Sequence, residues 1–153
     1  GVIRTYHTRH GAGPFPSEDR SLDPKKFDSF NGSESFAGRF RVGHFDYQMF
    51  KYALRVVGGV DNLSITHTDN LPNNEGIVVE NYKDAEDHIA LHKHKAYGVN
   101  QQETYTLTNE LMYAEPGLKR YLKAEALVER IADETKDRTK VLRSTGPKVS
   151  DWK

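Results

Sequence analysis

Cysteine is absent from this chain of 153 residues, and so is an excess of either charge. Without cysteine there are no disulfides, thiolate metal sites or cysteine nucleophiles, and the composition fits a reducing compartment such as the cytoplasm. Lysine plus arginine totals 22, as does aspartate plus glutamate. This balance provides no electrostatic attraction to nucleic acid or to an anionic membrane. No apolar run approaches the ~20 residues of a membrane span, so we expect neither partner.

Several motifs and processing signals are also missing. We find no Gly-x-x-x-x-Gly-Lys-Ser phosphate loop, no Gly-x-Ser-x-Gly nucleophile motif and no kinase signature. The chain opens in a strand-like segment, without an initiator methionine or the basic and apolar segments of a signal peptide. We therefore expect a fragment or a processed product that forms one folded domain over residues 1–153.

The apolar pattern indicates an α/β protein. Residues 2–8 alternate like a strand, and 47–57 show helical spacing with Asp46 as N-cap and Gly58-Gly59 as the end. Residues 17–37 read as a long loop, and 83–116 are polar with little pattern. The other predicted elements are strands over 63–66, 77–82 and 141–143 and a helix over 116–136. Alternating strands and helices predict layers of sheet and helix.

Three loops at strand ends are candidate ligand sites, namely 9–16, 67–71 and 144–147, because ligands gather at the carboxyl ends of strands in such folds. Arg39 and Arg41 can grip a carboxylate or phosphate with their planar guanidinium groups, or they can be two solvated arginines.

Each of the other motifs also has a functional and a purely structural interpretation when it is taken singly. Asp69 can accept the two N–H groups of a guanine edge, or it can cap a turn. Ser144-Thr145-Gly146-Pro147 can present backbone N–H groups to a ligand, or it can be an ordinary turn. His88, His92 and His94 suggest a metal site or a hydrolase, but a solvated charged segment explains them better.

The order of these motifs resembles the adenylosuccinate synthetase family. Arg9-His10-Gly11-Ala12-Gly13-Pro14-Phe15-Pro16-Ser17-Glu18 is similar to the family's arginine followed by Gly-Ala-Gly-Pro-Phe-Pro-Thr-Glu. Gly38-Arg39-Phe40-Arg41 with Gly43-His44-Phe45-Asp46 resembles its Gly-Arg-x-Arg and Gly-Trp-Phe-Asp segments. Thr66-His67-Thr68-Asp69 resembles Thr-Lys-x-Asp, and Ser144-Thr145-Gly146-Pro147 resembles Ser-x-Gly-Pro.

This resemblance implies the C-terminal part of the family's P-loop-like α/β fold, a mixed layered sheet with flanking helices. It implies a purine-biosynthesis ligase that joins aspartate, or a related amino acid, to C6 of an IMP-like monophosphate with GTP hydrolysis. The family's catalytic aspartate, histidine and phosphate loop belong to an amino-terminal half that is not in this chain. We therefore expect the isolated chain to be inactive. The complete enzyme is expected to be a cytoplasmic homodimer that uses GTP and Mg²⁺, with the Mg²⁺ ligands outside this chain.

The same resemblance assigns binding roles but no catalytic or metal-binding residue. Amino-acid and purine-monophosphate binding is implied for His10, Gly11, Ser35, Phe36, Ala37, Gly38, Arg39 and Arg41. GTP binding is implied for Arg41, His67, Thr68, Asp69, Ser144, Thr145 and Gly146.

The sequence departs from the family pattern at several places in these motifs. The arginine loop is one residue shorter, and His10 stands where many members have a small apolar residue. Phe36-Ala37 stands where the family has two threonines, and His67 stands where it has lysine. These traits also resemble the archaeal members and the phage enzymes that make 2-aminoadenylosuccinate. A non-catalytic nucleotide-binding or regulatory module that keeps this fold is the alternative function.

Overall fold

The computed structural model describes residues 1–28, 30, 36–83, 100–135 and 139–153. Its first sheet is parallel and has the strand order β1-β5-β10, formed by Val2–Arg4, Asn62–Thr66 and Lys140–Arg143. The register pairs Ile3 with Ile65, and Val141 with Leu63. Because β5 and β10 are parallel neighbours, the segments that follow them emerge at the same edge, as expected for the loops at 67–71 and 144–147.

Three smaller strand groups accompany this sheet. β2 (His7–His10) pairs antiparallel with β3 (Phe40–Gly43). β4 (Phe45–Asp46) runs parallel to β6 (Glu75–Val79), which pairs antiparallel with β9 (Lys119–Lys123). β7 (Tyr82–Lys83) pairs with β8 (Glu115–Pro116). The predicted mixed α/β architecture is therefore confirmed.

The helix predicted over 47–57 is confirmed as α2 (Tyr47–Val57). Asp46 caps it by accepting a hydrogen bond from the Met49 N–H at 3.0 Å. Gly58 ends it at a φ of 75°, a left-handed conformation that glycine adopts at little cost. Tyr82 donates its hydroxyl to the second Asp46 oxygen at 2.6 Å, and both side chains are buried. The cap thus joins α2 to β7.

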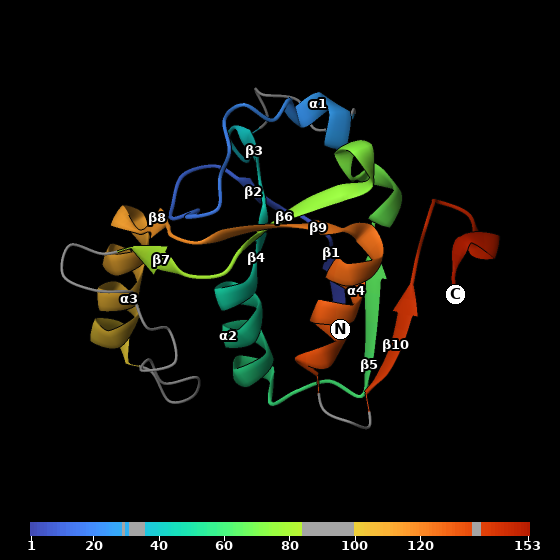
Figure 1. Ribbon diagram of the computed structural model, residues 1–153. Coiled ribbons are helices and arrows are strands. Elements are labelled where there is room, and N and C mark those ends of the chain that lie inside the picture. Colours follow the sequence, from blue (N-terminus) through green and yellow to red (C-terminus); the bar gives the residue numbers. More distant parts are fainter. Residues whose placement is uncertain (29, 31–35, 84–99, 136–138) are drawn as a thin grey trace.

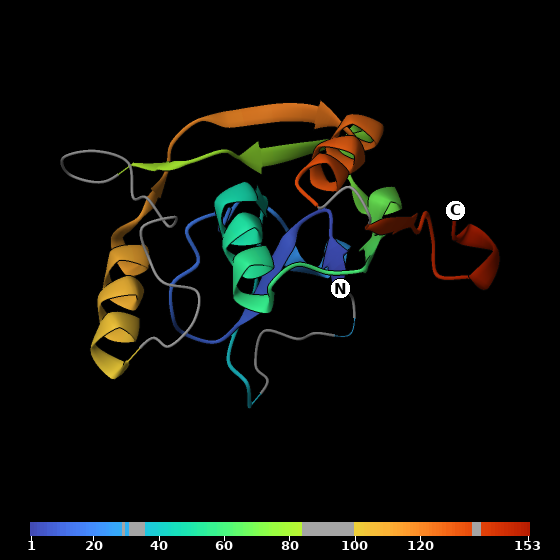
Figure 2. The same cartoon turned by 90° about the horizontal axis from the view of Figure 1, so that it is seen from below.

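The main core lies where α2 and α4 (Ala124–Asp133) pack against the strands. Phe45 and Phe50 contribute aromatic rings, and Leu127 and Ile131 contribute the buried face of α4. Figures 1 and 2 show α3 (Gln101–Tyr113) at the opposite end of the molecule from β5 and β10. The described residues also form four short helices, namely α1 (Pro24–Phe27), η1 (Thr68–Asn70), η2 (Pro72–Asn74) and η4 (Val149–Asp151).

Several element predictions need correction. The strand predicted over 77–82 is two strands, because β6 ends at Val79 and Tyr82 belongs to β7. The loop predicted over 17–37 contains the short helix α1. The single strand over 2–8 is wrong, because the chain breaks at Thr5-Tyr6 and its two parts join different sheets. The helix over 116–136 begins only at Ala124, because residues 119–123 pair with β6. The segment 83–116 contains α3, whose N-cap Asn100 forms a capping box with Glu103. Its polar faces hid the apolar pattern, and residues 84–99 lie outside the described part.

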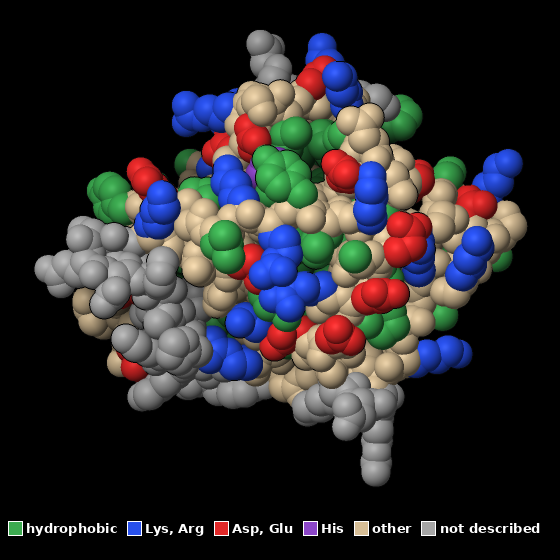
Figure 3. All heavy atoms as spheres, viewed as in Figure 1, with side chains coloured by type: hydrophobic (Ala, Val, Ile, Leu, Met, Phe, Trp, Pro, Cys, Tyr) green, Lys and Arg blue, Asp and Glu red, His purple; other side chains and the backbone are tan. Residues whose placement is uncertain are grey.

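Charges of both signs mix on the face that carries β9 and α4 (Figure 3). Glu80 forms ion pairs with Arg120 at 3.2 Å and with Arg130 at 2.8 Å. Lys123 pairs with Glu75 at 2.7 Å. Neither sign of charge dominates this face, which agrees with the balanced composition.

Candidate functional site

The predicted glycine loop after β2 is held against the segment before β3 by two closely packed glycines. Gly11 and Gly38 have φ angles of 71° and 83°. A Cβ on Gly38 would lie 2.7 Å from the Gly11 Cα, and a Cβ on Gly11 would lie 2.7 Å from the Ala37 carbonyl oxygen. The Gly11 N–H donates to the Arg39 carbonyl at 3.0 Å. Two of the predicted substrate-binding segments therefore meet, and only glycine fits at the contact.

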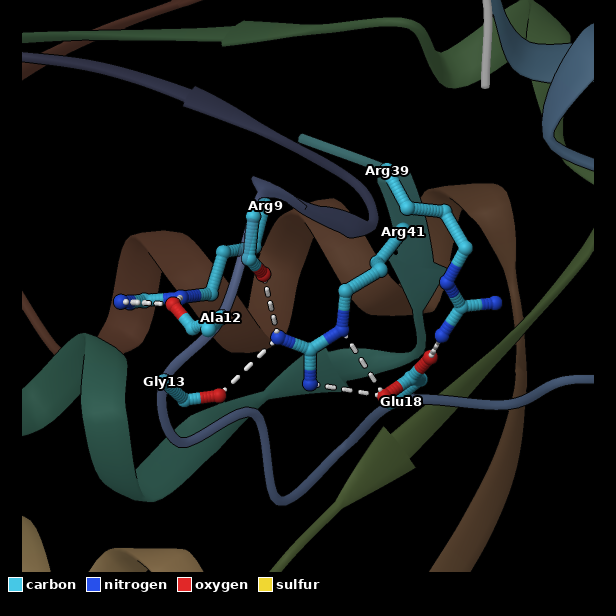
Figure 4. A network of polar contacts seen from close by, with 7 residues as sticks. Arg9, Ala12, Gly13, Glu18, Arg39 and Arg41 are labelled. Atoms are coloured by element: carbon cyan, nitrogen blue, oxygen red, sulfur yellow. Dashed lines mark hydrogen bonds and ion pairs between the residues drawn. The ribbon is translucent and has the colours of Figure 1, made fainter. Parts of the chain in front are cut away.

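Arginine side chains bind the carbonyl groups of this loop, as Figure 4 shows. Arg9 donates to the Ala12 carbonyl oxygen through Nε at 3.3 Å and Nη2 at 3.1 Å. Arg41 donates from Nη1 to the carbonyl oxygens of Gly11 at 3.0 Å and Gly13 at 2.9 Å. The loop conformation is thus fixed by side chains from β2 and β3.

Glu18 lies between the two arginines that the sequence singled out. Its Oε1 accepts from Arg39 Nη2 at 2.7 Å, and its Oε2 accepts from Arg41 Nε at 3.0 Å and Nη2 at 2.7 Å (Figure 4). Burial raises the pKa of Glu18, but the hydrogen bonds and positive charges of Arg41 and Arg39 outweigh it and hold the pKa below its ordinary value. Arg39 precedes β3, whereas Arg41 lies within that strand.

The backbone geometry brings Glu18 to this position. The Ser17 carbonyl accepts from the His44 N–H at 2.9 Å, and Glu18 forms an isolated bridge with Gly43. A Cβ on Gly43 would lie 2.3 Å from the Ser17 oxygen, so the close approach requires glycine. Sequence reasoning placed Glu18 in a motif but assigned it no role.

The remaining residues predicted to bind the amino acid and purine monophosphate have separate surroundings. His10 packs its ring on Phe40, with 4.9 Å between ring centroids. Its Nδ1 is buried and has no hydrogen-bond partner within the described residues. Phe36 is fully exposed and Ala37 is also exposed, whereas Ser35 lies outside the described residues.

The two predicted GTP-binding loops are joined at the ends of β5 and β10. Thr68 donates its hydroxyl to the Ser144 carbonyl at 2.8 Å, and the Ser144 N–H donates to Ile65 at 2.8 Å. The Ser144 hydroxyl in turn donates to the Gly146 carbonyl at 2.7 Å. The fold therefore brings 67–69 and 144–146 together, as expected from their places at strand ends, and leaves Asp69 exposed beside them.

His67 connects this region with the hinge between β1 and β2. It has a φ of 61°, uncommon for a residue with a side chain. Thr5 holds it by donating to its carbonyl at 2.8 Å, and its ring meets Tyr6 edge-on at 5.6 Å between centroids. Burial, with a smaller contribution from the charge of Arg4, lowers the pKa of His67. At neutral pH the ring is therefore uncharged, unlike the lysine of the family pattern.

Asp151 closes the loop after β10, a role that the sequence did not reveal. Its carbonyl accepts from the Thr145 N–H at 3.0 Å, and its Oδ2 accepts from the Lys148 N–H at 2.8 Å. A Cβ on Gly146 would lie 2.5 Å from that Oδ2. A side chain at position 146 would therefore push the Asp151 carboxylate away from the Lys148 N–H. Pairing with a residue five positions away leaves no periodic signal in the sequence.

An apolar cavity of about 210 Å³ lies elsewhere, between α1 and β6. The cavity is lined by His44 and by four aromatic side chains, those of Tyr6, Phe27, Phe45 and Tyr121. None of the predicted binding residues lines this cavity. Sequence reasoning did not single it out, because its walls come from segments far apart in the chain.

Neither a metal cluster nor a membrane span is found within the described residues. They contain no group of three or more His, Cys, Asp or Glu side chains placed to hold a metal ion. In that same part of the chain, no helix has the length and apolar character to cross a bilayer. The histidines at 88, 92 and 94 lie outside the described ranges.

Comparisons with known proteins agree on one family. A family model described as adenylosuccinate synthetase matches residues 1–151. An adenylosuccinate synthetase of Geotalea uraniireducens is 37% identical over 81 residues, which cover 52% of this chain and 19% of that protein. One of Thermotoga maritima is 36% identical over 95 residues, covering 60% and 23%. The matched segments thus span about a fifth of the length of these relatives.

A solved structure supports the fold independently. The fully ligated adenylosuccinate synthetase of Plasmodium falciparum superposes with a TM-score of 0.68 at 17% identity, covering 99% of this chain and 38% of that one. The likeness extends over nearly all of the chain, so this chain shares its layered α/β arrangement with a part of that synthetase. The family match over residues 1–151 includes both groups of loops described above. This chain belongs to the adenylosuccinate synthetase family.

Proposed function

We propose that this chain is the amino-acid- and nucleotide-binding part of a purine-biosynthesis ligase. The complete enzyme would join aspartate, or a related amino acid, to C6 of an IMP-like monophosphate with GTP hydrolysis. Family membership supports this reaction class. The observation that carries the proposal is the meeting of 67–69 with 144–146 at one sheet edge, with exposed Asp69 beside backbone groups.

The proposed chemistry requires a leaving group at C6. A purine 6-oxygen leaves poorly until GTP converts it to a phosphate ester. The amino nitrogen then forms a bond to C6 while the C6–O bond breaks and phosphate departs. The family's catalytic aspartate, histidine and phosphate loop are not among the motifs of this chain, so we propose that this part binds and orients the reactants.

Asp69 is the proposed guanine reader. An ionised carboxylate accepts hydrogen bonds only, so it can pair with the N1–H and N2–H₂ donors of guanine but not with adenine, whose N1 is an acceptor. Asp69 is exposed and follows Thr68, whose hydroxyl binds the Ser144 carbonyl. We therefore propose that the turn from Ser144 to Gly146 forms the other side of the base site. We therefore assign GTP rather than ATP to this position.

Arg39 is the proposed contact for the amino-acid carboxylate, because its side chain is 53% exposed. An equivalent contact by Arg41 would require it to exchange a bond to Glu18 or to the glycine loop for a ligand oxygen. Phe36 and Ala37 replace the hydroxyl groups of the family pattern, which is why a related amino acid stands beside aspartate in the proposal.

Mg²⁺ belongs to the complete enzyme in this proposal. The described residues offer no cluster of carboxylates or histidines that fits the ion, so we derive no step through it. A homodimer and a cytoplasmic location likewise remain predictions for the complete protein.

Calorimetric titration of the purified chain tests the proposal. GTP should bind, ATP should bind much more weakly, and Asp69→Asn should remove the difference. The chain alone should form no adenylosuccinate from IMP, aspartate and GTP, but mixing it with the amino-terminal half of a family member should restore turnover. GTP binding without restored turnover would favour a regulatory module, and robust turnover by the chain alone would refute the proposed division of labour.

A further inference from the structure

The carboxylate of Glu18 contacts two guanidinium groups through different oxygen atoms. Oε2 accepts both bonds from Arg41, and Oε1 accepts the bond from Arg39. The Glu18 side chain is 13% exposed, so its interactions with the arginines are only partly screened by water. Glu18 thus connects the partly buried Arg41 with the exposed Arg39 of the proposed amino-acid site.

All three guanidinium nitrogens of Arg41 donate hydrogen bonds. Its side chain is 12% exposed and makes four hydrogen bonds, two to Glu18 and one each to the Gly11 and Gly13 carbonyls. A guanidinium has five N–H donors in a fixed plane, so these bonds set the position of the loop relative to Glu18. With Arg9 on the Ala12 carbonyl, three consecutive carbonyls are bound by arginine.

Arg39 differs in exposure and in the number of its contacts. Within the described residues its guanidinium makes one hydrogen bond, from Nη2 to Glu18 Oε1. The rest of the planar group is available for a ligand oxygen, and Figure 4 shows its other terminal nitrogen pointing away from Glu18. Two arginines with one glutamate leave one positive charge, which a single ligand carboxylate neutralises.

We infer that Glu18 is a positioning residue of the amino-acid site: Oε2 holds Arg41 as the clamp of the 11–13 loop, and Oε1 orients Arg39 toward the ligand carboxylate. The inference rests on the proposed function for its ligand, but the clamp itself does not depend on any ligand. A carboxylate bonded on both oxygens restricts both guanidiniums, so the site is ordered before binding and less ordering is required of the complex.

Glu18→Gln in the full chain is the decisive variant, because it keeps the size of the side chain and replaces one acceptor oxygen by a donor group. Proton exchange at the arginine Nε–H groups and at the backbone amides of residues 11–13 would be followed by NMR. Aspartate would then be titrated as the probe ligand. Glu75→Gln is the matched control, since it removes the carboxylate of an exposed ion pair with Lys123.

We expect Glu18→Gln to accelerate exchange at Arg41 Nε–H and in the loop, and to raise the dissociation constant for aspartate at least about tenfold, as expected for loss of a hydrogen bond to a charged group. Glu18→Asp should recover part of both effects, and Glu75→Gln should match the wild type. Arg41→Lys, which keeps the charge, should loosen the loop but leave the Arg39–Glu18 contact.

The two parts of the experiment fail separately. Unchanged exchange in Glu18→Gln would overturn the clamp, and tighter aspartate binding would show that Glu18 competes with the ligand instead of positioning Arg39. If aspartate does not bind the wild-type chain, the proposed amino-acid site is wrong, while the exchange data still decide the role of Glu18 in the loop.

Discussion

Replacing Asp46 by asparagine should change how the stability of this protein depends on pH. Asp46 caps α2 and is 1% exposed, with the Met49 N–H on one oxygen and the Tyr82 hydroxyl on the other. Burial raises the pKa of Asp46 to about 6, against the hydrogen bonds from Met49 and Tyr82, which lower it. Asparagine is an equally good N-cap, so Asp46→Asn removes the ionisation and keeps the cap.

The size and sign of this effect on the unfolding free energy follow from the difference in the pKa of Asp46 between the folded and unfolded states. The pKa of Asp46 rises from 3.8 to about 6 on folding, and each unit corresponds to about 1.36 kcal/mol, which gives roughly 3 kcal/mol. Between these values the folded protein holds the proton more tightly than the unfolded chain. The contribution of Asp46 to the unfolding free energy therefore falls as pH rises through this window and is constant above it.

Three histidines change the unfolding free energy in the opposite direction over nearly the same pH range. Burial lowers the pKa of His7 to about 4 and also lowers that of His44 and His67. Their contributions to stability are lost as pH falls below their unfolded value of 6.5. The total profile of the wild type therefore combines opposing titrations, and the difference between wild type and Asp46→Asn isolates the carboxyl group.

Urea unfolding followed by circular dichroism at pH 4, 5, 6, 7 and 8 would measure this difference. The stability of Asp46→Asn relative to wild type should rise by up to about 3 kcal/mol from pH 4 to pH 7. Tyr82→Phe, which removes the donor, should raise the pKa of Asp46 further and move the window upward. Parallel profiles for wild type and Asp46→Asn, within about 0.5 kcal/mol, would refute the reasoning about this buried cap.

Three further predictions concern the proposed site. Arg39→Lys in the complete enzyme should raise KM for the amino acid about tenfold, because lysine lacks the planar fork; unchanged kinetics would leave Arg39 a surface residue. Asp69→Asn should weaken GTP binding by ~2–4 kcal/mol in calorimetry, and equal affinity would remove its role in reading guanine. Gly38→Ala should destabilise the chain by more than about 2 kcal/mol in urea unfolding, since left-handed backbone costs ~1–2 kcal/mol and the new Cβ would lie 2.7 Å from Gly11. Gly58→Ala, at a similar φ of 75°, is its comparison, and an equal loss would show that the clash adds nothing.

Local patterns were sufficient where the determining interactions lie close together in the chain. The helix over 47–57 has its cap, apolar face and glycine stop within fourteen residues, and it is present with those bounds. The short strand after Asp61 and the last strand before Ser144 were also predicted nearly in place. Residue types indicated the glycine loop, because few other residues allow such a turn. The loops at 67–71 and 144–147 were indicated by their place after predicted strands.

Tertiary pairing decided the elements that local patterns did not. Tyr121 and Leu122 fit the helical spacing of the apolar residues between Leu118 and Ile131. Residues 119–123 nevertheless pair with β6 and form a strand. Thr5-Tyr6 looks like strand interior, yet it is the point where the chain leaves one sheet for another. Backbone hydrogen bonds to distant strands outweigh local preference in both cases, and a single sequence contains no record of the partner.

Residue types and their spacing were enough to identify the family motifs, the α/β class and the chemical groups of the site. The different surroundings of the two arginines follow from the tertiary structure: Arg41 is largely enclosed by Glu18 and loop carbonyls, while Arg39 remains exposed. It also placed Thr68 against Ser144, 76 positions apart. The physical reason is that motif spacing specifies which chemical groups are present, whereas burial and hydrogen-bond partners depend on which distant segments the sheets bring together.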